Sequence, residues 1–192
     1  MTPEAELLLA EAERVEAAAD LEIGLPESGA RLAAALAEVL SEASLASASP
    51  RAVWRLLWLA ADLTTQVDVY RATALLDAVE RLFARHFQRE LTGPGELAET
   101  AEMAFDLFFN RPDQPLTAYR FEPVLGALGR VLELDNRHCR RAALHGLGHV
   151  RQQARSDAQR TRIDALFDSF LLRNEDQGLA VYAARSRAGE LA

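Results

Sequence analysis

The stretch that decides the fold is Asn136 to Val150, which reads N-R-H-C-R-R-A-A-L-H-G-L-G-H-V. Successive residues of an α-helix are rotated by about 100°, so this order places apolar side chains, arginines and histidines on three separate arcs. The apolar arc holds Cys139, Ala143, Leu147 and Val150, the cationic arc holds Arg137, Arg140, Arg141 and Arg151, and the third arc holds His138, His145 and His149. We therefore predict one helix with a core face, a cationic face and a histidine face.

The composition is that of a globular protein, since 49% of the 192 residues are hydrophobic and 26% are charged. No apolar run approaches the ~20 residues that a membrane-spanning helix needs. The N-terminus is acidic where a secretory signal is basic. Cys139 is the only cysteine, so an intramolecular disulfide is excluded. These observations predict a cytoplasmic protein.

Charge is distributed unevenly along the chain. Residues 1–50 hold ten carboxylates and two arginines, so they account for the whole net charge of -8, whereas residues 137–162 hold seven arginines and one aspartate. All 21 basic residues are arginine, which, with the abundant Ala, Leu and Glu, indicates base-composition bias in the coding DNA. The basic segment is expected to pair with carboxylates, either its own or those of a partner.

Helix signals recur along the chain, and convincing strand signals do not. Thr2 and Ser49 each precede a proline at the first helical position, and L-T-G-P-G at 91–95 cannot continue a helix. Asp135 and Ser156 are the predicted N-caps of the helices that follow them. Apolar periodicity predicts helices at about 3–20, 28–44, 50–63, 68–90, 96–109, 121–134, 136–154, 157–172 and 179–187.

The short connections between these segments make consecutive helices antiparallel neighbours. We therefore predict a single all-α domain over residues 1–192, with acidic N-terminal helices in 1–46 and helix pairs in about 50–188. Its eight or nine helices form either antiparallel stacked pairs or an irregular multi-helix bundle.

Residues 121–150, F-E-P-V-L-G-A-L-G-R-V-L-E-L-D-N-R-H-C-R-R-A-A-L-H-G-L-G-H-V, resemble one repeat of the HEAT-like α-solenoid superfamily. The resemblance lies in a first helix, a short turn at L-D-N and a second helix that carries A-A-L-x-x-L-G. Each helical glycine costs roughly 1 kcal/mol relative to alanine, which indicates a packing reason for it. No second copy occurs at a fixed period. The resemblance implies a curved stack of helix pairs whose inner surface binds a protein or, in some relatives, nucleic acid.

The histidine face is the chemically suggestive part of the segment. His145 and His149 are spaced i, i+4 and could share one metal ion, but His138 lies two turns away and no carboxylate stands on the same arc. We favour hydrogen bonds from these histidines to a neighbouring helix, with no metal and no cofactor. Cys139 lies on the core arc, so we interpret it as a buried structural residue.

Aromatic residues elsewhere are interpreted as core, including Trp54 with Trp58 and the cluster at 105–109. Asp106, embedded in A-F-D-L-F-F, is the carboxylate to check first for a perturbed pKa, and a helix face that ends in solvent also explains its position. The chain contains no G-x-S-x-G, H-E-x-x-H, C-x-x-C or glycine-rich phosphate loop. We therefore expect no catalytic residues and no enzymatic activity.

The predicted function is that of a non-catalytic protein-interaction module, either an adaptor or a subunit of a complex. The predicted partner-binding residues are Arg137, Arg140, Arg141, His145, His149, Arg151 and Arg155, facing an acidic protein. Nucleic-acid binding is an alternative, opposed by the pI of about 5.1 and by the absence of an aromatic stacking platform. A metal-dependent enzyme that uses the histidine stripe is a second alternative. A homo-oligomer, in which the acidic first 50 residues dock on another subunit's arginines, also stays open.

Overall fold

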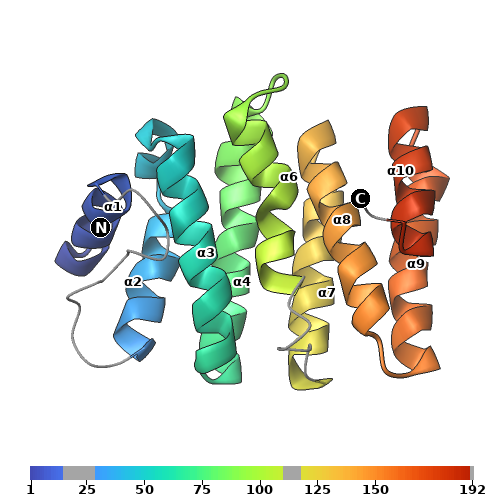
Figure 1. Cartoon of the computed structure of the whole chain (residues 1–192), viewed down its shortest axis with the longest axis horizontal. Coiled ribbons are helices and arrows are strands. Elements are labelled where there is room, and N and C mark those ends of the chain that lie inside the picture. Colours follow the sequence, from blue (N-terminus) through green and yellow to red (C-terminus); the bar gives the residue numbers. More distant parts are fainter. Residues whose placement is uncertain (15–28, 110–117, 191–192) are drawn as a thin grey trace. The chain divides into compact units, whose positions relative to one another are not determined.

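The computed structural model of the chain describes residues 1–14, 29–109 and 118–190 (Figure 1). Within those ranges the protein is all-α and has no strand, and it contains 9 helices when the continuous helical segment at 69–90 is counted once. The chain divides into two compact units, Met1–Thr100 and Ala101–Ala192. The prediction that these units form a single domain stays a prediction.

The N-terminal unit is built around four helices, α1 (Pro3–Arg14), α2 (Gly29–Ser41), α3 (Pro50–Gln66) and α4 (Val69–Leu82). Helix α1 packs on α2 and α3, and α2 packs on both α3 and α4. The acidic N-terminal helices therefore share a core with the helices that follow them. Arg55 is part of this core, being 2% exposed, and its guanidinium donates to the Ala12 carbonyl oxygen at 2.5 Å.

Two shorter segments complete this unit. A 3-10 turn, η2 (Ala43–Ser47), follows α2, and the segment η3 (Phe83–Phe87) has π-helical hydrogen bonding and leads into α5 (Gln88–Glu90). Because η3 joins α4 to α5 without a break, the helix predicted at 68–90 is confirmed.

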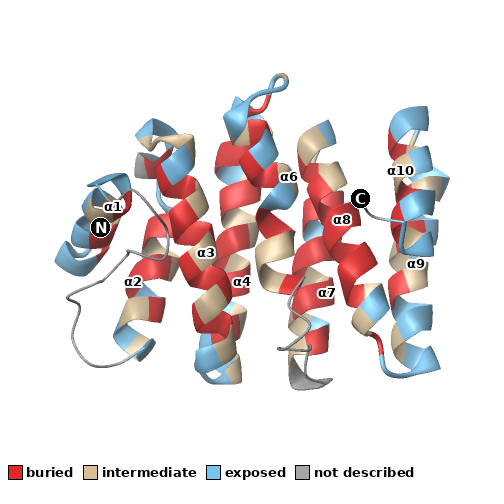
Figure 2. Cartoon of the chain, viewed as in Figure 1, coloured by how far each residue is buried: buried red, intermediate tan, exposed pale blue. Residues whose placement is uncertain are grey.

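The C-terminal unit contains most of α6 (Glu96–Phe109), whose first turn belongs to the N-terminal unit. It continues with α7 (Ala118–Leu132), α8 (Arg137–Gln153), α9 (Asp157–Arg173) and α10 (Gln177–Ala188). Helix α8 packs against α7, α9 and α10. Residues 142–150 of α8 are all buried, so this part of the helix has no solvent-facing side (Figure 2).

Gly146 explains how α8 accommodates its neighbours. A Cβ atom added there would lie 2.9 Å from Leu128 Cδ2 of α7 and 2.9 Å from Phe105 Cβ of α6. Those distances are too short for real carbon atoms, so only glycine permits this approach of the three helices. The close helix packing that a glycine in this helix indicated is therefore observed at Gly146.

Helix starts follow the capping signals closely. Ser49 accepts from the Ala52 amide at 3.1 Å with Pro50 at the first position of α3, and Ser156 accepts from the Gln159 amide at 3.2 Å. One predicted cap is wrong: α8 is capped by Asn136, not Asp135. The Asn136 side chain accepts from the amides of His138 at 2.9 Å and Cys139 at 3.2 Å, and an ion pair engages Asp135 instead.

Several predicted boundaries differ from the observed ones by a few residues. The helix predicted at 121–134 spans Ala118–Leu132, and the one predicted at 179–187 spans Gln177–Ala188. The predicted extension of the first helix beyond residue 14 lies outside the described residues, as does the connection between the helices predicted at 96–109 and 121–134 up to residue 117. No helix in the described part of the chain is long and apolar enough to span a bilayer.

Candidate functional site

The predicted histidine face of α8 points into the C-terminal unit. His145 is 7% exposed and His149 is 8% exposed, so neither lies on the open surface where partner binding was predicted. The neighbouring helices α6 and α10 supply the polar groups that contact them. The hydrogen bonds to a neighbouring helix that the sequence favoured are confirmed.

Asp106 of α6 lies between these two imidazoles. Its Oδ1 atom is 2.5 Å from His145 Nε2 and 2.6 Å from His149 Nε2, and the two Nε2 atoms are 3.2 Å apart. The carboxylate missing from the histidine arc of α8 therefore comes from another helix. The signal in the sequence was the position of Asp106 within an apolar run, but nothing local paired it with the histidines.

A second row of polar contacts extends from this cluster. The Tyr182 hydroxyl of α10 lies 2.6 Å from His145 Nδ1, and the Arg141 guanidinium carbon lies 4.7 Å from the centre of the Tyr182 ring. Glu102 of α6 contacts two residues of α8. Its Oε2 atom lies 3.3 Å from Arg141 Nε, and its Oε1 atom lies 2.7 Å from His138 Nδ1. These contacts form one network that links α6, α8 and α10.

The network fixes the ionisation of two of its members. Burial alone raises the pKa of Asp106, but hydrogen bonds from His145 and His149 outweigh it and lower the pKa to about 2. Burial raises the pKa of Tyr182, against the opposing effect of a hydrogen bond from Arg141. At neutral pH, Asp106 is therefore an anion and Tyr182 a neutral phenol. Asp106, the carboxylate that the sequence marked for checking, therefore has a pKa that departs from its ordinary value.

Asp106, His145 and His149 have the donor set of a metal site. Each offers one ligand atom, and these atoms lie within 4.8 Å of one another. In the described part of the chain, no other group of three or more His, Cys, Asp or Glu side chains meets that condition.

Most of the predicted cationic arc is engaged in ion pairs within the C-terminal unit. Besides the contact between Arg141 and Glu102, Arg137 Nε lies 2.9 Å from Asp176 and Arg151 Nε lies 2.8 Å from Asp164. Arg155 is exposed in the turn between α8 and α9. Carboxylates of the chain itself therefore pair with much of the cationic arc that the sequence analysis predicted to face a partner.

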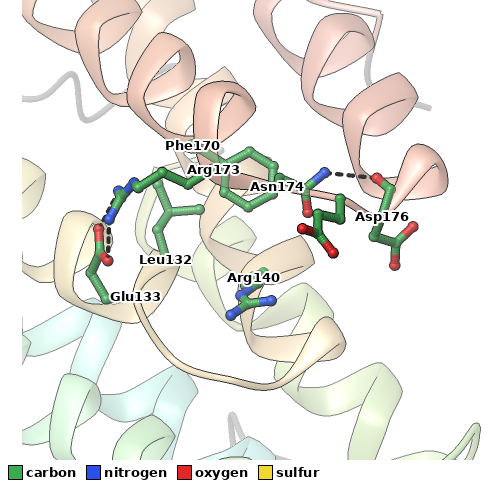
Figure 3. Close-up of a pocket in the computed structure, with 8 residues that line it drawn as sticks. Leu132, Glu133, Arg140, Phe170, Arg173, Asn174 and Asp176 are labelled. Atoms are coloured by element: carbon green, nitrogen blue, oxygen red, sulfur yellow. Dashed lines mark hydrogen bonds and ion pairs between the residues drawn. The ribbon is translucent and has the colours of Figure 1, made fainter.

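Arg140 is in a different position, because it lines a pocket of about 310 Å³ (Figure 3). Its ion partner, Asp135 at 3.2 Å, has a side chain that is 93% exposed. Leu132 and Phe170 form the apolar part of the wall, with the ion pair between Glu133 and Arg173 beside them. The other lining residues are Asn174, Glu175 and Asp176.

Cys139 and the aromatic residues have structural positions. Cys139 is fully buried, and this burial raises the pKa of its thiol to about 12, so the reactive thiolate is not populated at neutral pH. Phe105 and Phe109 are buried and stack with ring centres 5.9 Å apart. Trp54 and Trp58 are half-buried in α3.

Comparison of the chain with protein families, curated proteins and solved structures finds no match of any of the three kinds. Function is therefore inferred from the contacts within the C-terminal unit.

Proposed function

We propose that the chain is a non-catalytic protein-interaction module that binds an acidic residue of another protein beside Arg140. The observation that carries the proposal is the pocket itself, in which a guanidinium adjoins the apolar side chains of Leu132 and Phe170. A carboxylate on a partner can accept from Arg140 while its neighbouring carbon atoms contact this apolar wall.

The existing ion pair of Arg140 is easily replaced. Asp135 is almost fully exposed, and exposed ion pairs are worth about 0–1 kcal/mol. A partner's carboxylate in the pocket is less exposed to water, so its attraction to Arg140 is screened less. Exchanging Asp135 for a partner's carboxylate therefore costs little, and the new ion pair is less exposed to water than the old one.

Two of the three pocket carboxylates are already neutralised. Glu133 accepts two hydrogen bonds of 2.6 Å from Arg173, and Asp176 accepts from Arg137 at 2.9 Å. Glu175 is exposed and is the group that opposes an incoming anion. The pocket therefore fits a single acidic side chain better than a run of them.

The HEAT-like resemblance of residues 121–150 supports the same proposal. These residues form most of α7 and α8, which pack on each other and are joined by the short turn at 133–136. We propose that α7 and α8 are one HEAT-like pair, and Arg140 lies at the start of its second helix. Interaction with other proteins is the common use of such pairs.

Charge reversal at Arg140 tests the proposal. Wild-type protein and the Arg140→Glu variant are used to capture proteins from the native host, and captured proteins are then purified and titrated directly. Arg162→Glu is the matched control, because Arg162 is an exposed arginine whose own partner is Glu122, with two bonds of 2.7 Å. We expect Arg140→Glu to weaken binding at least tenfold and Arg162→Glu to leave it unchanged. Equal binding by all three proteins contradicts the proposal.

The same preparations separate the alternative partners. Retardation of nucleic acid in a gel at low salt, abolished as salt is raised, would assign the cationic side chains to phosphate binding. A mass that rises with protein concentration in sedimentation would identify a second copy of the chain as the partner. Either result would argue for that partner and against a distinct acidic protein.

A further inference from the structure

We propose that Asp106, His145 and His149 together bind one divalent transition-metal ion. The three ligand atoms come from two helices and converge on one point, with separations of 2.5, 2.6 and 3.2 Å. His145 and His149 are one helical turn apart on α8, so both rings face the same side, and Asp106 of α6 closes the set from opposite them.

The spacing of the two imidazole nitrogens fits a shared ion. Metal–nitrogen bonds of about 2.0–2.1 Å in a tetrahedral site place neighbouring ligand atoms about 3.3 Å apart. The observed separation of the two Nε2 atoms is 3.2 Å. Asp106 Oδ1 is closer to both nitrogens than this, so the carboxylate has to withdraw by less than about 1 Å to admit the ion. A change of the Asp106 rotamer supplies such a movement.

Three polar atoms of the cluster lie unusually close together. One carboxylate oxygen and two imidazole nitrogens lie within 2.5–3.2 Å of one another, so three potential ligand atoms face one small volume. A carboxylate and two neutral imidazoles can each present a lone pair to a shared ion. One metal ion can therefore take the place of these close contacts.

The outer contacts of the cluster suit a metal ligand. Metal-bound histidines use their second ring nitrogen to hydrogen-bond a neighbouring group, which orients the ring. His145 Nδ1 has such a neighbour in the Tyr182 hydroxyl, at 2.6 Å. Arg141 lies over the Tyr182 ring and is held by Glu102 in turn. With Nε2 on the ion, Nδ1 is the ring nitrogen of His145 that stays in contact with the tyrosine hydroxyl.

One member of the cluster borders a pocket. His145 lines a pocket of about 280 Å³ together with Tyr182 and Arg141, whereas Asp106 and His149 do not line it. The cluster is therefore nearest to open space on the side of His145.

The donor set selects the class of metal. Two imidazoles and one carboxylate suit zinc, cobalt, nickel or iron, whereas magnesium and calcium prefer sites made of oxygen atoms. Three protein ligands leave at least one coordination position for water or a small ligand. The proposed ion is therefore held in an open site and not in a closed four-ligand one.

Metal titration of the full chain, purified without a histidine tag and stripped with EDTA, tests the proposal. Calorimetry with Zn²⁺ measures affinity, and the visible spectrum with Co²⁺ reports nitrogen and oxygen coordination. We expect one ion per chain and the intense bands of a low-coordinate Co²⁺ complex. The absence of both a Zn²⁺ isotherm and a Co²⁺ spectrum at millimolar metal would overturn the proposal.

Variants locate the ion. His149→Ala is expected to lower the affinity for Zn²⁺ at least about 100-fold, and Tyr182→Phe, which removes an outer contact, about 10–100-fold. His86→Ala is the matched control, because His86 lies in η3 and is the one histidine of the chain outside this network. It is expected to bind Zn²⁺ as the wild type does.

Equal affinity of the wild type and His149→Ala, or loss of binding only in His86→Ala, would place the ion elsewhere and refute the proposal. If His149→Ala does not fold, Asp106→Asn decides the question, because it keeps the side-chain shape while removing the anionic ligand. Unchanged Zn²⁺ affinity in folded Asp106→Asn contradicts the site.

Discussion

Gly146 shows at the level of one residue how close the helices of the C-terminal unit lie. We expect Gly146→Ala to destabilise the protein by about 1–2 kcal/mol, because the new methyl group meets Leu128 and Phe105 at 2.9 Å. The gain in helix propensity, about 1 kcal/mol, offsets part of this cost. Urea unfolding followed by circular dichroism measures the change.

Gly129 is the matched control for that substitution. A Cβ atom at Gly129 would lie 3.6 Å from Leu166 Cδ2, which is an ordinary contact. Gly129→Ala is therefore expected to stabilise the protein by up to about 1 kcal/mol. Destabilisation of equal size in both variants would show that the tight approach at Gly146 is not what constrains that position.

Glu175 is the residue that limits binding in the proposed pocket. Glu175→Gln removes a negative charge that repels an incoming carboxylate, so the affinity for the proposed acidic partner should rise, by about two- to fivefold at low salt. The gain should shrink as salt is raised. Titrations of the purified partner at two salt concentrations measure it, and a weaker complex with Glu175→Gln would argue against an acidic ligand.

The start of helix α8 depends on Asn136. Replacing Asn136 by alanine leaves the amides of His138 and Cys139 without their acceptor, and the expected loss is about 1 kcal/mol. Asp135→Ala is the comparison, because its exposed ion pair with Arg140 contributes little. Thermal or urea unfolding of both variants measures the difference. A larger loss from Asp135→Ala would restore the cap predicted from the sequence.

The helices themselves could be predicted because their signals are local. Ser49 with Pro50, and Ser156, act on amides within the next three residues, so the sequence alone places the starts of α3 and α9. Two adjacent capping residues, Asp135 and Asn136, could not be ranked in this way. The choice depends on backbone geometry, which only the structure supplies.

The site could be predicted only in part, because its members are far apart in the chain. The i, i+4 pair His145 and His149 is visible in the sequence, and so is the unusual setting of Asp106. Asp106 is 39 positions from His145 and 43 positions from His149 in the chain, so their contacts depend on how α6 packs on α8. The burial of both imidazoles has the same origin, since a helical wheel does not show how many neighbours cover a helix.

At the scale of the whole C-terminal unit, Asp164 joins three helices. It lies on α9 and accepts from Arg151 of α8 at 2.8 Å and from Arg187 of α10 at 3.1 Å. The hydrogen bond from Arg151 lowers the pKa of this carboxyl below its ordinary value of 3.8, against the opposing effect of burial. A carboxyl with a lowered folded-state pKa stabilises the fold above its unfolded-state pKa and loses that effect as the pH falls through the folded-state value.

Asp164→Asn should therefore destabilise the protein at pH 7 by about 1–2 kcal/mol, and the difference from the wild type should shrink below about pH 4. Glu122→Gln, which removes an exposed ion pair with Arg162, should cost less than about 1 kcal/mol. Denaturant unfolding between pH 7 and pH 3 measures both. A difference at Asp164 that stays constant over this range would exclude the charged form as its cause.

The buried run at residues 142–150 has a consequence for the timescale of motion. A helix segment covered on every side exposes its amides to exchange only when much of the surrounding unit opens. Arg140 lies two residues before this run, and His145 and His149 lie within it. Both proposed ligands therefore meet a preformed backbone, and any adjustment on binding falls to side chains.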